Sequence, residues 1–174
     1  MARALARLHA RPAPPGLRPT ADGSTALARD TRAILARCPT ESAAPLFDLA
    51  PRGSVPPSGA ACLLHGDAVP GNLIRTRAGI ALIDWQCPAV GDPVHDLAVF
   101  LSPAMQLIYR GSALSPAETA GFLGSYGRTD VVDRYRALAP WLHWRIAAYC
   151  LWRSTQAAAD YEAAMALELQ HLPS

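Results

Sequence analysis

The sequence predicts a mostly helical α+β fold with a small β element at its centre. Apolar residues recur at helical spacing near the N-terminus and through the C-terminal half, where several helix-start signals also occur. Short apolar runs bounded by turn residues lie between these regions, and such runs are typical of strands. The chain has 174 residues, room for about one domain, and we assign residues 1–174 to a single domain.

The N-terminal third predicts two helices and a long loop. Residues 1–11 place leucines on one face and arginines on another, and a second helical stripe runs from Asp22 until Pro39 ends it. Residues 39–60 contain five prolines and two glycines. We therefore expect an irregular loop there, with one helical turn at residues 45–50.

The central residues predict two or three short strands. The apolar runs are residues 61–64, 73–74 and 80–83. Residues 75–79 form a turn between the last two runs, so we expect these to pair as a hairpin. The loop between the first two runs contains a Pro-Gly pair, which allows it to turn back on itself.

Helix-start signals divide the rest of the chain. Asp92 and Ser102 are each followed by proline, which is favoured at the first position of a helix. Ser115 and Glu118 have the spacing of a capping box, and Gly127 is placed to end that helix. The expected helices run from 92 to about 101, from 102 onward, from 115 to 127, and from 130 to about 171 with a break or kink at Pro140.

The composition argues against several classes of protein. The formal net charge is +2, too small to indicate nucleic acid or an anionic membrane as a partner, and no run of about 18 apolar residues could span a bilayer. The cysteines lie far apart and match no zinc spacing, which favours a reducing, cytoplasmic location over a disulfide framework. They are Cys38, Cys62, Cys87 and Cys150.

Acidic and amide side chains stand where the central strands end. Asp67 and Asn72 flank the loop after the first run, and Asp84 follows the hairpin. Two carboxylates and an amide oxygen are hard ligands suited to Mg²⁺, which keeps several waters for phosphate oxygens. A carboxylate that does not bind the metal can accept the proton of an attacking hydroxyl. This set of side chains therefore fits phosphoryl transfer.

Three motifs contain these residues. They are His-Gly-Asp-x-x-x-x-Asn at 65–72, Ile-Asp-Trp at 83–85, and Gly-Asp-Pro-x-x-Asp-Leu-Ala at 91–98. In this order they resemble the aminoglycoside phosphotransferase and choline kinase superfamily, whose members are small-molecule kinases with a protein-kinase-like fold. The resemblance implies that this chain is the C-terminal lobe of such a fold.

The resemblance also implies a role for each motif residue. Asp67 would be the catalytic base, and Asn72 and Asp84 would be the Mg²⁺ ligands of a reaction that uses ATP as co-substrate. Asp96 would hydrogen-bond the backbone of the catalytic loop. His65 would pack against that loop and hold it in place.

Differences from protein kinases favour a small alcohol as the acceptor. Gly66 replaces the arginine of the kinase H-R-D motif, and the seven residues between Asp84 and Asp92 are too few for a long activation loop. The implied acceptors are compounds such as choline, thiamine, a sugar or an aminoglycoside. Candidate substrate-binding residues are Trp85, Trp141 and Trp144, because aromatic faces bind quaternary ammonium groups, although a helical stripe of tryptophans is more often core.

The parts that grip the nucleotide in this superfamily are missing from the sequence. No glycine-rich pattern precedes the catalytic loop, and all 16 basic residues are arginine, so the strand lysine is absent. The opening LARLHARP resembles the segment that follows the hinge between the lobes. We therefore expect an inactive chain, whether it is a fragment, a product of a wrongly assigned start, or a natural single-lobe protein. The uncovered lobe junction would favour self-association or binding of a partner N-terminal lobe.

Two other functions remain open at this stage. A metal phosphohydrolase of the HD type needs a His, a His-Asp pair and a later Asp, which His65, His95, Asp96 and Asp130 supply in order. The second is a single-lobe module that binds a small molecule without catalysis. Bound transition metal would favour the first, and ligand binding without nucleotide or magnesium would favour the second.

Overall fold

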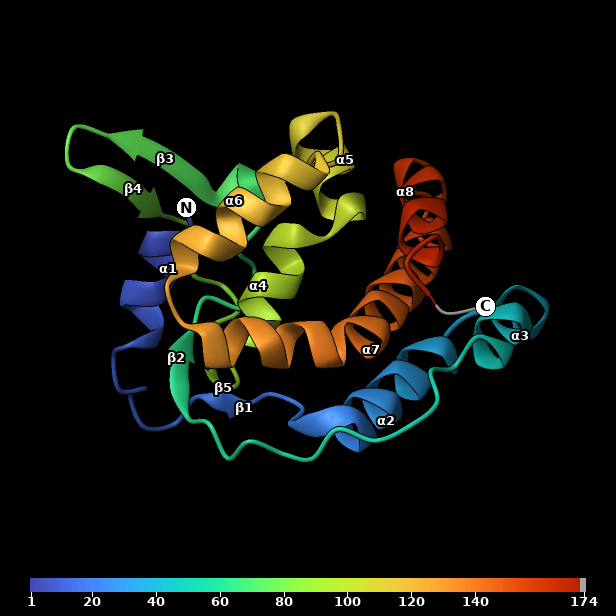
Figure 1. Cartoon of the computed structure of the whole chain (residues 1–174). Coiled ribbons are helices and arrows are strands. Elements are labelled where there is room, and N and C mark those ends of the chain that lie inside the picture. The colour runs from blue at the N-terminus through green and yellow to red at the C-terminus, as the bar shows by residue number, and fades with distance from the viewer. Residues whose placement is uncertain (173–174) are drawn as a thin grey trace.

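Helices make up most of the molecule, and two small sheets lie toward one end (Figure 1). The computed structural model describes residues 1–172. The helices are α1 Ala2–His9, α2 Gly23–Leu35, α3 Thr40–Asp48, α4 Val94–Leu101, α5 Pro103–Arg110, α6 Pro116–Tyr126, α7 Thr129–Ser154 and α8 Asp160–Leu169. The strands are β1 Arg18–Pro19, β2 Cys62–Leu64, β3 Leu73–Thr76, β4 Gly79–Leu82 and β5 Ala89–Gly91, and a 3-10 turn covers Pro70–Asn72. This composition confirms the predicted α+β class, and none of the described helices is both long and apolar enough to cross a bilayer.

The two sheets differ in how well the sequence anticipated them. The predicted hairpin is present, with β3 and β4 paired antiparallel from Leu73↔Leu82 to Thr76↔Gly79. The other sheet has the order β1-β5-β2, and two of its strands were not predicted. β1 has two residues and β5 has three, so neither is long enough to show the alternation of apolar and polar residues that identifies a strand in a sequence. Both are strands because a neighbouring strand supplies backbone hydrogen-bond partners.

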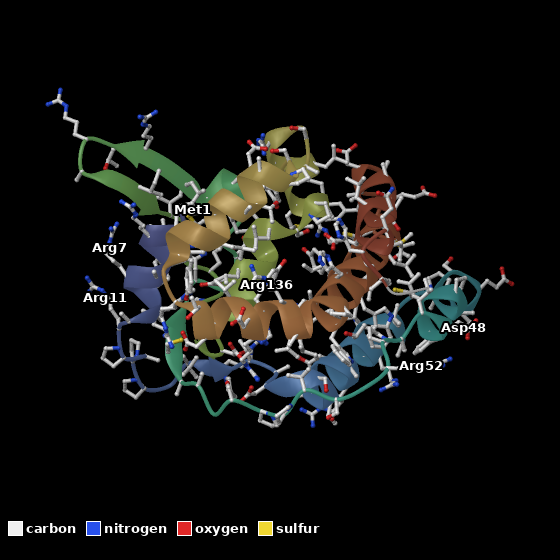
Figure 2. The ribbon with its side chains drawn as sticks, in the orientation of Figure 1. Met1, Arg7, Arg11, Asp48, Arg52 and Arg136 are labelled. Carbon is white, nitrogen blue, oxygen red and sulfur yellow. The ribbon has the colours of Figure 1, made fainter. Side chains whose placement is uncertain are left out.

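Helix α1 is amphipathic, as the sequence predicts. Leu5 is fully buried and Leu8 nearly so. Arg7, and Arg11 just beyond the helix end, project away from the body of the molecule (Figure 2). His9, in the last turn, is also buried, and its contacts belong to the site described below.

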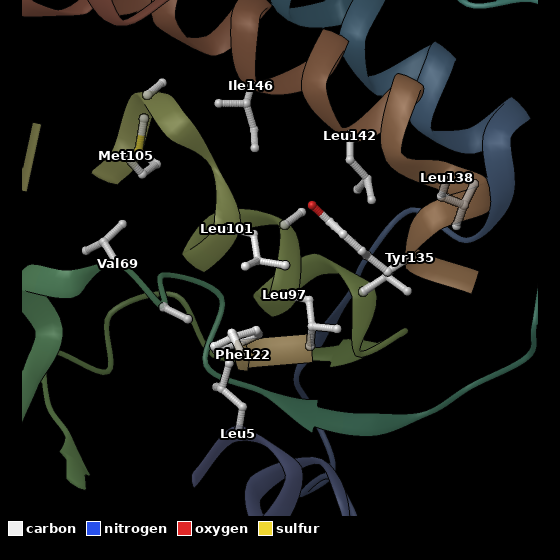
Figure 3. Close-up of a cluster of buried hydrophobic side chains, with 14 of the residues drawn as sticks. Leu5, Val69, Leu97, Leu101, Met105, Phe122, Tyr135, Leu138, Leu142 and Ile146 are labelled. Atoms are coloured by element: carbon white, nitrogen blue, oxygen red, sulfur yellow. The ribbon is translucent and has the colours of Figure 1, made fainter. Parts of the chain in front are cut away.

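The main hydrophobic core is built around α4. Leu97 and Leu101 of this helix lie between Leu5 of α1 on one side and Leu138 of α7 on the other (Figure 3). A fully buried leucine contributes about 1.5–3 kcal/mol relative to an exposed one. Because α4 is packed on more than one side, it is a rigid support for whatever its first turn contacts.

The prediction of an irregular loop over residues 39–60 was wrong in its first part, because α3 forms there. Leu46 of α3 packs against Trp144 of α7, and the Trp144 indole N–H donates to the Leu46 carbonyl at 2.6 Å. Pro45 lies inside the helix and removes one backbone donor, which local reasoning counts against a helix. Packing against α7, far away in the sequence, outweighs that local cost.

The predicted interruption of the last helical region lies at a different residue. Helix α7 continues through Pro140 as one element, although its ribbon bends along its course (Figure 1). The chain instead leaves the helix between Ser154 and Asp160, where Ala157 adopts a positive φ of 62°. This break lets α8 fold back against α7 and α5. A proline can be accommodated by a bend, whereas folding back requires a real loop.

The helix-start signals at Ser102 and Ser115 are confirmed, whereas α4 begins at Val94, two residues after the predicted cap Asp92. Ser102 caps α5 by accepting from the Met105 backbone N–H, and Ser115 with Glu118 forms a complete capping box at α6. Buried Glu168 of α8 adds to the α5 cap by accepting from the Ser102 hydroxyl and the Ala104 N–H. A carboxylate at the positive end of the α5 dipole thus joins α8 to α5.

A charged cluster centred on Arg134 of α7 joins three parts of the chain. Its guanidinium pairs with Asp22, at the start of α2, at 2.8 Å, and with buried Asp92, just before α4. Asp22 also accepts from the backbone N–H groups of Ser58 and Gly59, both at 2.8 Å. Burial alone would raise the pKa of Asp22, but these hydrogen bonds and the charge of Arg134 outweigh it and lower the pKa below its usual value.

The lowered pKa of Asp22 predicts a pH-dependent contribution to folding. A carboxyl whose pKa is lower in the folded state stabilises the fold above its unfolded pKa of about 3.9, and that stabilisation is lost as the pH falls through the folded value. We expect Asp22→Asn to lower the free energy of unfolding at pH 7 and to have little effect near pH 2.5, measured by urea denaturation. Asp133→Asn, which removes an exposed i,i+3 pair with Arg136, is the control. An equal loss at both pH values would contradict the assignment.

Candidate active site

The loop between β2 and β3 brings Asp67 and Asn72 into direct contact. The Asn72 side-chain amide N–H₂ donates to the Asp67 carboxylate at 2.9 Å and to the Asp67 carbonyl at 2.9 Å. The 3-10 turn at Pro70–Asn72 closes the loop so that residues five apart meet. Both amide hydrogens are thereby used, which leaves the Asn72 side-chain oxygen and one Asp67 carboxylate oxygen uncommitted among the described residues.

The start of this loop is held by Asp96, in the first turn of α4. Its carboxylate is fully buried and accepts from the backbone N–H of His65 at 2.8 Å and of Gly66 at 2.9 Å. A third hydrogen bond comes from the His9 ring at 2.9 Å. A buried carboxylate is tolerated only when it is paired and fully hydrogen-bonded, and three donors meet that condition here.

His9 and Tyr126 belong to the same buried network and were not predicted as site residues. The second ring nitrogen of His9 lies 2.8 Å from the Tyr126 hydroxyl. This links α1 and α6 to the catalytic loop through Asp96. The available signal was the Leu-His pair within LARLHARP, which sequence reasoning used to place the segment and not to assign a role.

His65 connects the loop to the end of the hairpin. Its Nε2 lies 2.9 Å from the carbonyl of Ile83, and because a carbonyl can only accept, Nε2 carries the proton. Its Nδ1 then accepts the backbone N–H of Asp67, at 3.3 Å. The Trp85 ring packs edge-on against His65 at a centroid distance of 4.5 Å. His65 thus contacts both segments that carry the candidate metal ligands.

Gly66 is required by the path of the loop. Its φ of +80° lies in the left-handed region, and a Cβ placed on it would lie 1.9 Å from the Cys87 carbonyl oxygen. No side chain fits at that distance. Gly66, which replaces the arginine of the kinase H-R-D motif, is therefore required because the backbone at Cys87 passes so close to it.

Ile83, the residue before Asp84, connects the hairpin to the loop through its backbone. The Ile83 N–H donates to the Asn72 carbonyl at 3.0 Å, and the Ile83 carbonyl accepts from His65. Asp84 itself has a positive φ of 60°, a conformation that costs roughly 1–2 kcal/mol for a residue with a Cβ. Its carboxylate is exposed and has no hydrogen-bond partner among residues 1–172. Strain of this kind is characteristic of residues with a functional role.

The donor set fits Mg²⁺ in kind. The uncommitted Asn72 oxygen and the Asp84 carboxylate are hard oxygen ligands, too few to enclose an ion, so that water and phosphate oxygens would complete the shell. In the described part of the chain, no group of three or more His, Cys, Asp or Glu side chains could hold a metal. The HD-type arrangement is accordingly not assembled: His65 bonds Ile83, His95 bonds the Ala21 carbonyl, and Asp130 pairs with Arg128.

The candidate substrate-binding tryptophans separate into two groups. Trp85 is 43% exposed and lies next to the catalytic loop. Trp141 and Trp144 are buried in the hydrophobic core and line no part of the cavity that adjoins the catalytic loop. They are therefore core residues, as is usual for a helical stripe of tryptophans. The aromatic residues of α7 that do line the cavity are Tyr149 and Trp152, which belong to the same aromatic segment but were not among the candidate substrate-binding residues.

That cavity has a volume of about 670 Å³ and adjoins the catalytic loop. It lies among β1, α2, α4 and α7, and Gly66 of the loop forms part of its wall. Tyr149 on the α7 side has a raised pKa because of burial, with smaller contributions from Tyr161 and from the charge of Asp67.

Comparison with known proteins agrees with this geometry. Residues 1–141 match the phosphotransferase enzyme family known as APH. The chain belongs to this family. No curated protein sequence matches it significantly.

Among solved structures, this chain is similar to macrolide 2′-phosphotransferase from Brachybacterium faecium, a crystal structure of the apoenzyme. The two chains share 24% sequence identity and superpose with a TM-score of 0.50. The similarity covers 95% of this chain and 57% of the other, so this chain spans little more than half the length of that enzyme. The match supports the kinase-like fold inferred from the sequence motifs.

The network at Asp96 predicts a large effect of an isosteric substitution. Asp96→Asn removes the charge and turns an NH₂ group toward a donor, so at least one buried N–H loses its acceptor. We expect a loss of about 2–4 kcal/mol in the free energy of unfolding, measured by urea denaturation. Asp133→Asn at an exposed position of α7 is the matched control and should change stability by less than about 0.5 kcal/mol. Equal effects of the two substitutions would show that Asp96 does not hold the loop.

Proposed function

We propose that this phosphotransferase is the catalytic lobe of an ATP-dependent kinase that phosphorylates a hydroxyl of a small molecule. Asp67 is assigned as the catalytic base, and Asn72 and Asp84 as the residues that would hold Mg²⁺. His65 and Asp96 are assigned as positioning residues. The bound metal ion supplies neutralisation of charge on the phosphates.

One observation carries this proposal: the double hydrogen bond from the Asn72 amide to Asp67. It directs the amide oxygen away from Asp67 and fixes one oxygen of the Asp67 carboxylate. The remaining carboxylate oxygen can accept the proton of an acceptor hydroxyl as that hydroxyl attacks phosphorus. If Asp67 and Asn72 were only turn residues, the loop would not need the buried Asp96 carboxylate that holds it or the positive φ of Asp84.

The proposal includes a nucleotide-binding lobe that this sequence does not supply. The chain has no lysine and no glycine-rich loop ahead of Asp67. Large apolar side chains are exposed around the catalytic loop and hairpin: Ile74 47%, Ile83 38%, Trp85 43% and Tyr109 44%. Apolar side chains gathered at a functional site favour coverage by another protein surface. We assign that face to the missing lobe, whether it comes from a partner chain or from a longer gene product.

A second candidate is a single-lobe module that binds a small molecule without catalysis. The observation in its favour is the cavity, whose described wall consists of residues of this chain. Calorimetry separates the two candidates. Ligand binding that is indifferent to Mg·ATP favours the module, and binding strengthened by Mg·ATP favours the kinase.

The assignment of Asp67 predicts a specific loss of activity. We expect the chain alone to transfer no phosphate from ATP to a panel of hydroxyl compounds, measured as acceptor-dependent ADP release. With a nucleotide-binding lobe supplied, by an in-frame upstream extension or a partner, turnover should appear, and Asp67→Asn should lower kcat by ~10²–10⁴-fold. Asp133→Asn should leave kcat unchanged. Full activity of Asp67→Asn would exclude its role as base.

The metal assignment can be tested on this chain as it stands, with Mn²⁺ as a paramagnetic probe. We expect saturable broadening of the Asn72 side-chain amide and of backbone signals near Asp84 in NMR spectra. Asp84→Asn should weaken Mn²⁺ binding about tenfold or more, since even supporting residues of metal sites contribute that much. Asp130→Asn, in an exposed pair with Arg128, is the control. Broadening centred elsewhere, or unchanged in Asp84→Asn, would remove the metal site from the proposal.

A further inference from the structure

The cavity beside the catalytic loop is lined by more positive than negative side chains. Three arginines, Arg18, Arg37 and Arg145, lie in its wall together with two acids, Asp30 and Asp96. Asp96 is already satisfied by three donors from the loop and α1. Only Asp30 therefore remains to balance three guanidinium groups.

Arg145 is the unusual member of this set because of its surroundings. It lies on the face of α7 that also carries Leu142, Ile146 and Tyr149, an apolar stripe directed inward. Its Nε is enclosed from solvent and has no hydrogen-bond partner within residues 1–172, and its guanidinium forms no ion pair there. Arg145 as a whole is half-buried, so only this one donor is cut off from both water and protein. Removing a cationic donor from water without a partner is costly, and a nearby anion would offset part of that cost.

A second enclosed polar atom near the cavity also lacks a hydrogen-bond partner. Thr20, which follows β1 and lines the cavity, has a buried hydroxyl without a partner in the described chain. Unsatisfied buried polar atoms are few in native proteins. The described residues contain four such atoms, on Thr20, Gln106, Arg145 and Arg153, and two of these residues, Thr20 and Arg145, line this one cavity.

The electrostatics of Arg145 agree with this geometry. Burial lowers its pKa, and the nearby charge of Arg18 lowers it further, while Asp30 acts in the opposite direction. The direction of this shift agrees with one acid, Asp30, set against the burial of Arg145 and the charge of Arg18. An anion in the cavity would supply the missing attraction.

The mouth of the cavity carries the other two arginines. Arg18 and Arg37 are exposed, and the Arg37 guanidinium lies 4.3 Å above the centroid of the Trp152 ring. Stacking orients a guanidinium without using its hydrogen-bond donors, which stay available to a ligand. The volume of about 670 Å³ is within the range of small-molecule sites.

We infer that this cavity binds an anionic group, a carboxylate or a phosphate, at Arg145, and that the phosphoryl acceptor carries this group. The second half of the inference rests on the proposed function, and the first half does not. Arginine matches the planar, bidentate geometry of both anions. The acceptor hydroxyl would then lie toward Gly66 and Asp67, at the loop side of the cavity. Cationic acceptors such as choline or an aminoglycoside fit poorly, because Asp30 is the one uncommitted acid in the wall.

The test uses the 174-residue chain and two probes, inorganic phosphate and acetate, at constant ionic strength. We expect saturable shifts of the Arg145 Nε–H signal in NMR spectra with at least one probe. Arg145→Gln should weaken the dissociation constant tenfold or more, and Arg18→Gln, at the exposed mouth, should weaken it by a smaller factor. The probe that binds more tightly identifies the acid class of the acceptor.

The matched control is Arg136→Gln, on the same helix at an exposed position (Figure 2). Binding should be unchanged in this variant. The titration requires no phosphate transfer, so a kinase assay that fails would leave the anion site intact. No saturable shift at Arg145, equal binding by Arg145→Gln, or tighter binding of choline than of either anion would overturn the inference. If Arg145→Gln does not fold, the signal of the unmodified chain and the Arg18→Gln variant decide the matter.

Discussion

The arrangement of the site depends on one buried carboxylate. Asp96 accepts hydrogen bonds from the His65 and Gly66 backbone and from His9. A buried carboxylate is stable only when its hydrogen-bond donors are fixed in place. The same hydrogen bonds that stabilise the Asp96 charge therefore also fix the position of the loop. Because α4 lies in the centre of the core, the catalytic loop is attached to the most rigid part of the molecule.

A short series of hydrogen bonds carries this rigidity to the reacting groups. His65 joins the loop to Ile83, and Ile83 joins the hairpin to Asn72. Asn72 then orients Asp67. Only one side-chain oxygen, the Asp67 carboxylate oxygen that accepts from Asn72, is used in this series. The other Asp67 carboxylate oxygen and the Asn72 side-chain oxygen remain free among the described residues. A polar network satisfied on its buried side and open on the other is suited to binding a charged substrate.

The two surfaces next to this network differ in chemistry. The hairpin side exposes apolar side chains, whereas the wall between α2 and α7 carries arginines that exceed its acids. The fold is shared with macrolide 2′-phosphotransferase, but a fold does not determine a substrate. Most of the residues that line the cavity lie outside the three motifs, and α7 and α4 contribute several of them.

The sequence by itself determined the class of the fold, the capped starts of α5 and α6, the hairpin, and the identity of the loop residues. These follow from local rules, since a cap, a turn or a motif is written in neighbouring residues. Tertiary structure alone decided the rest. Helix α3 is stabilised by its contact with Trp144, and α7 continues through Pro140. The roles of His9 and Arg145 can be inferred only from their positions next to Asp96 and in the cavity wall. The physical reason is that packing and burial depend on residues distant in the chain, and no local pattern records which ones will meet.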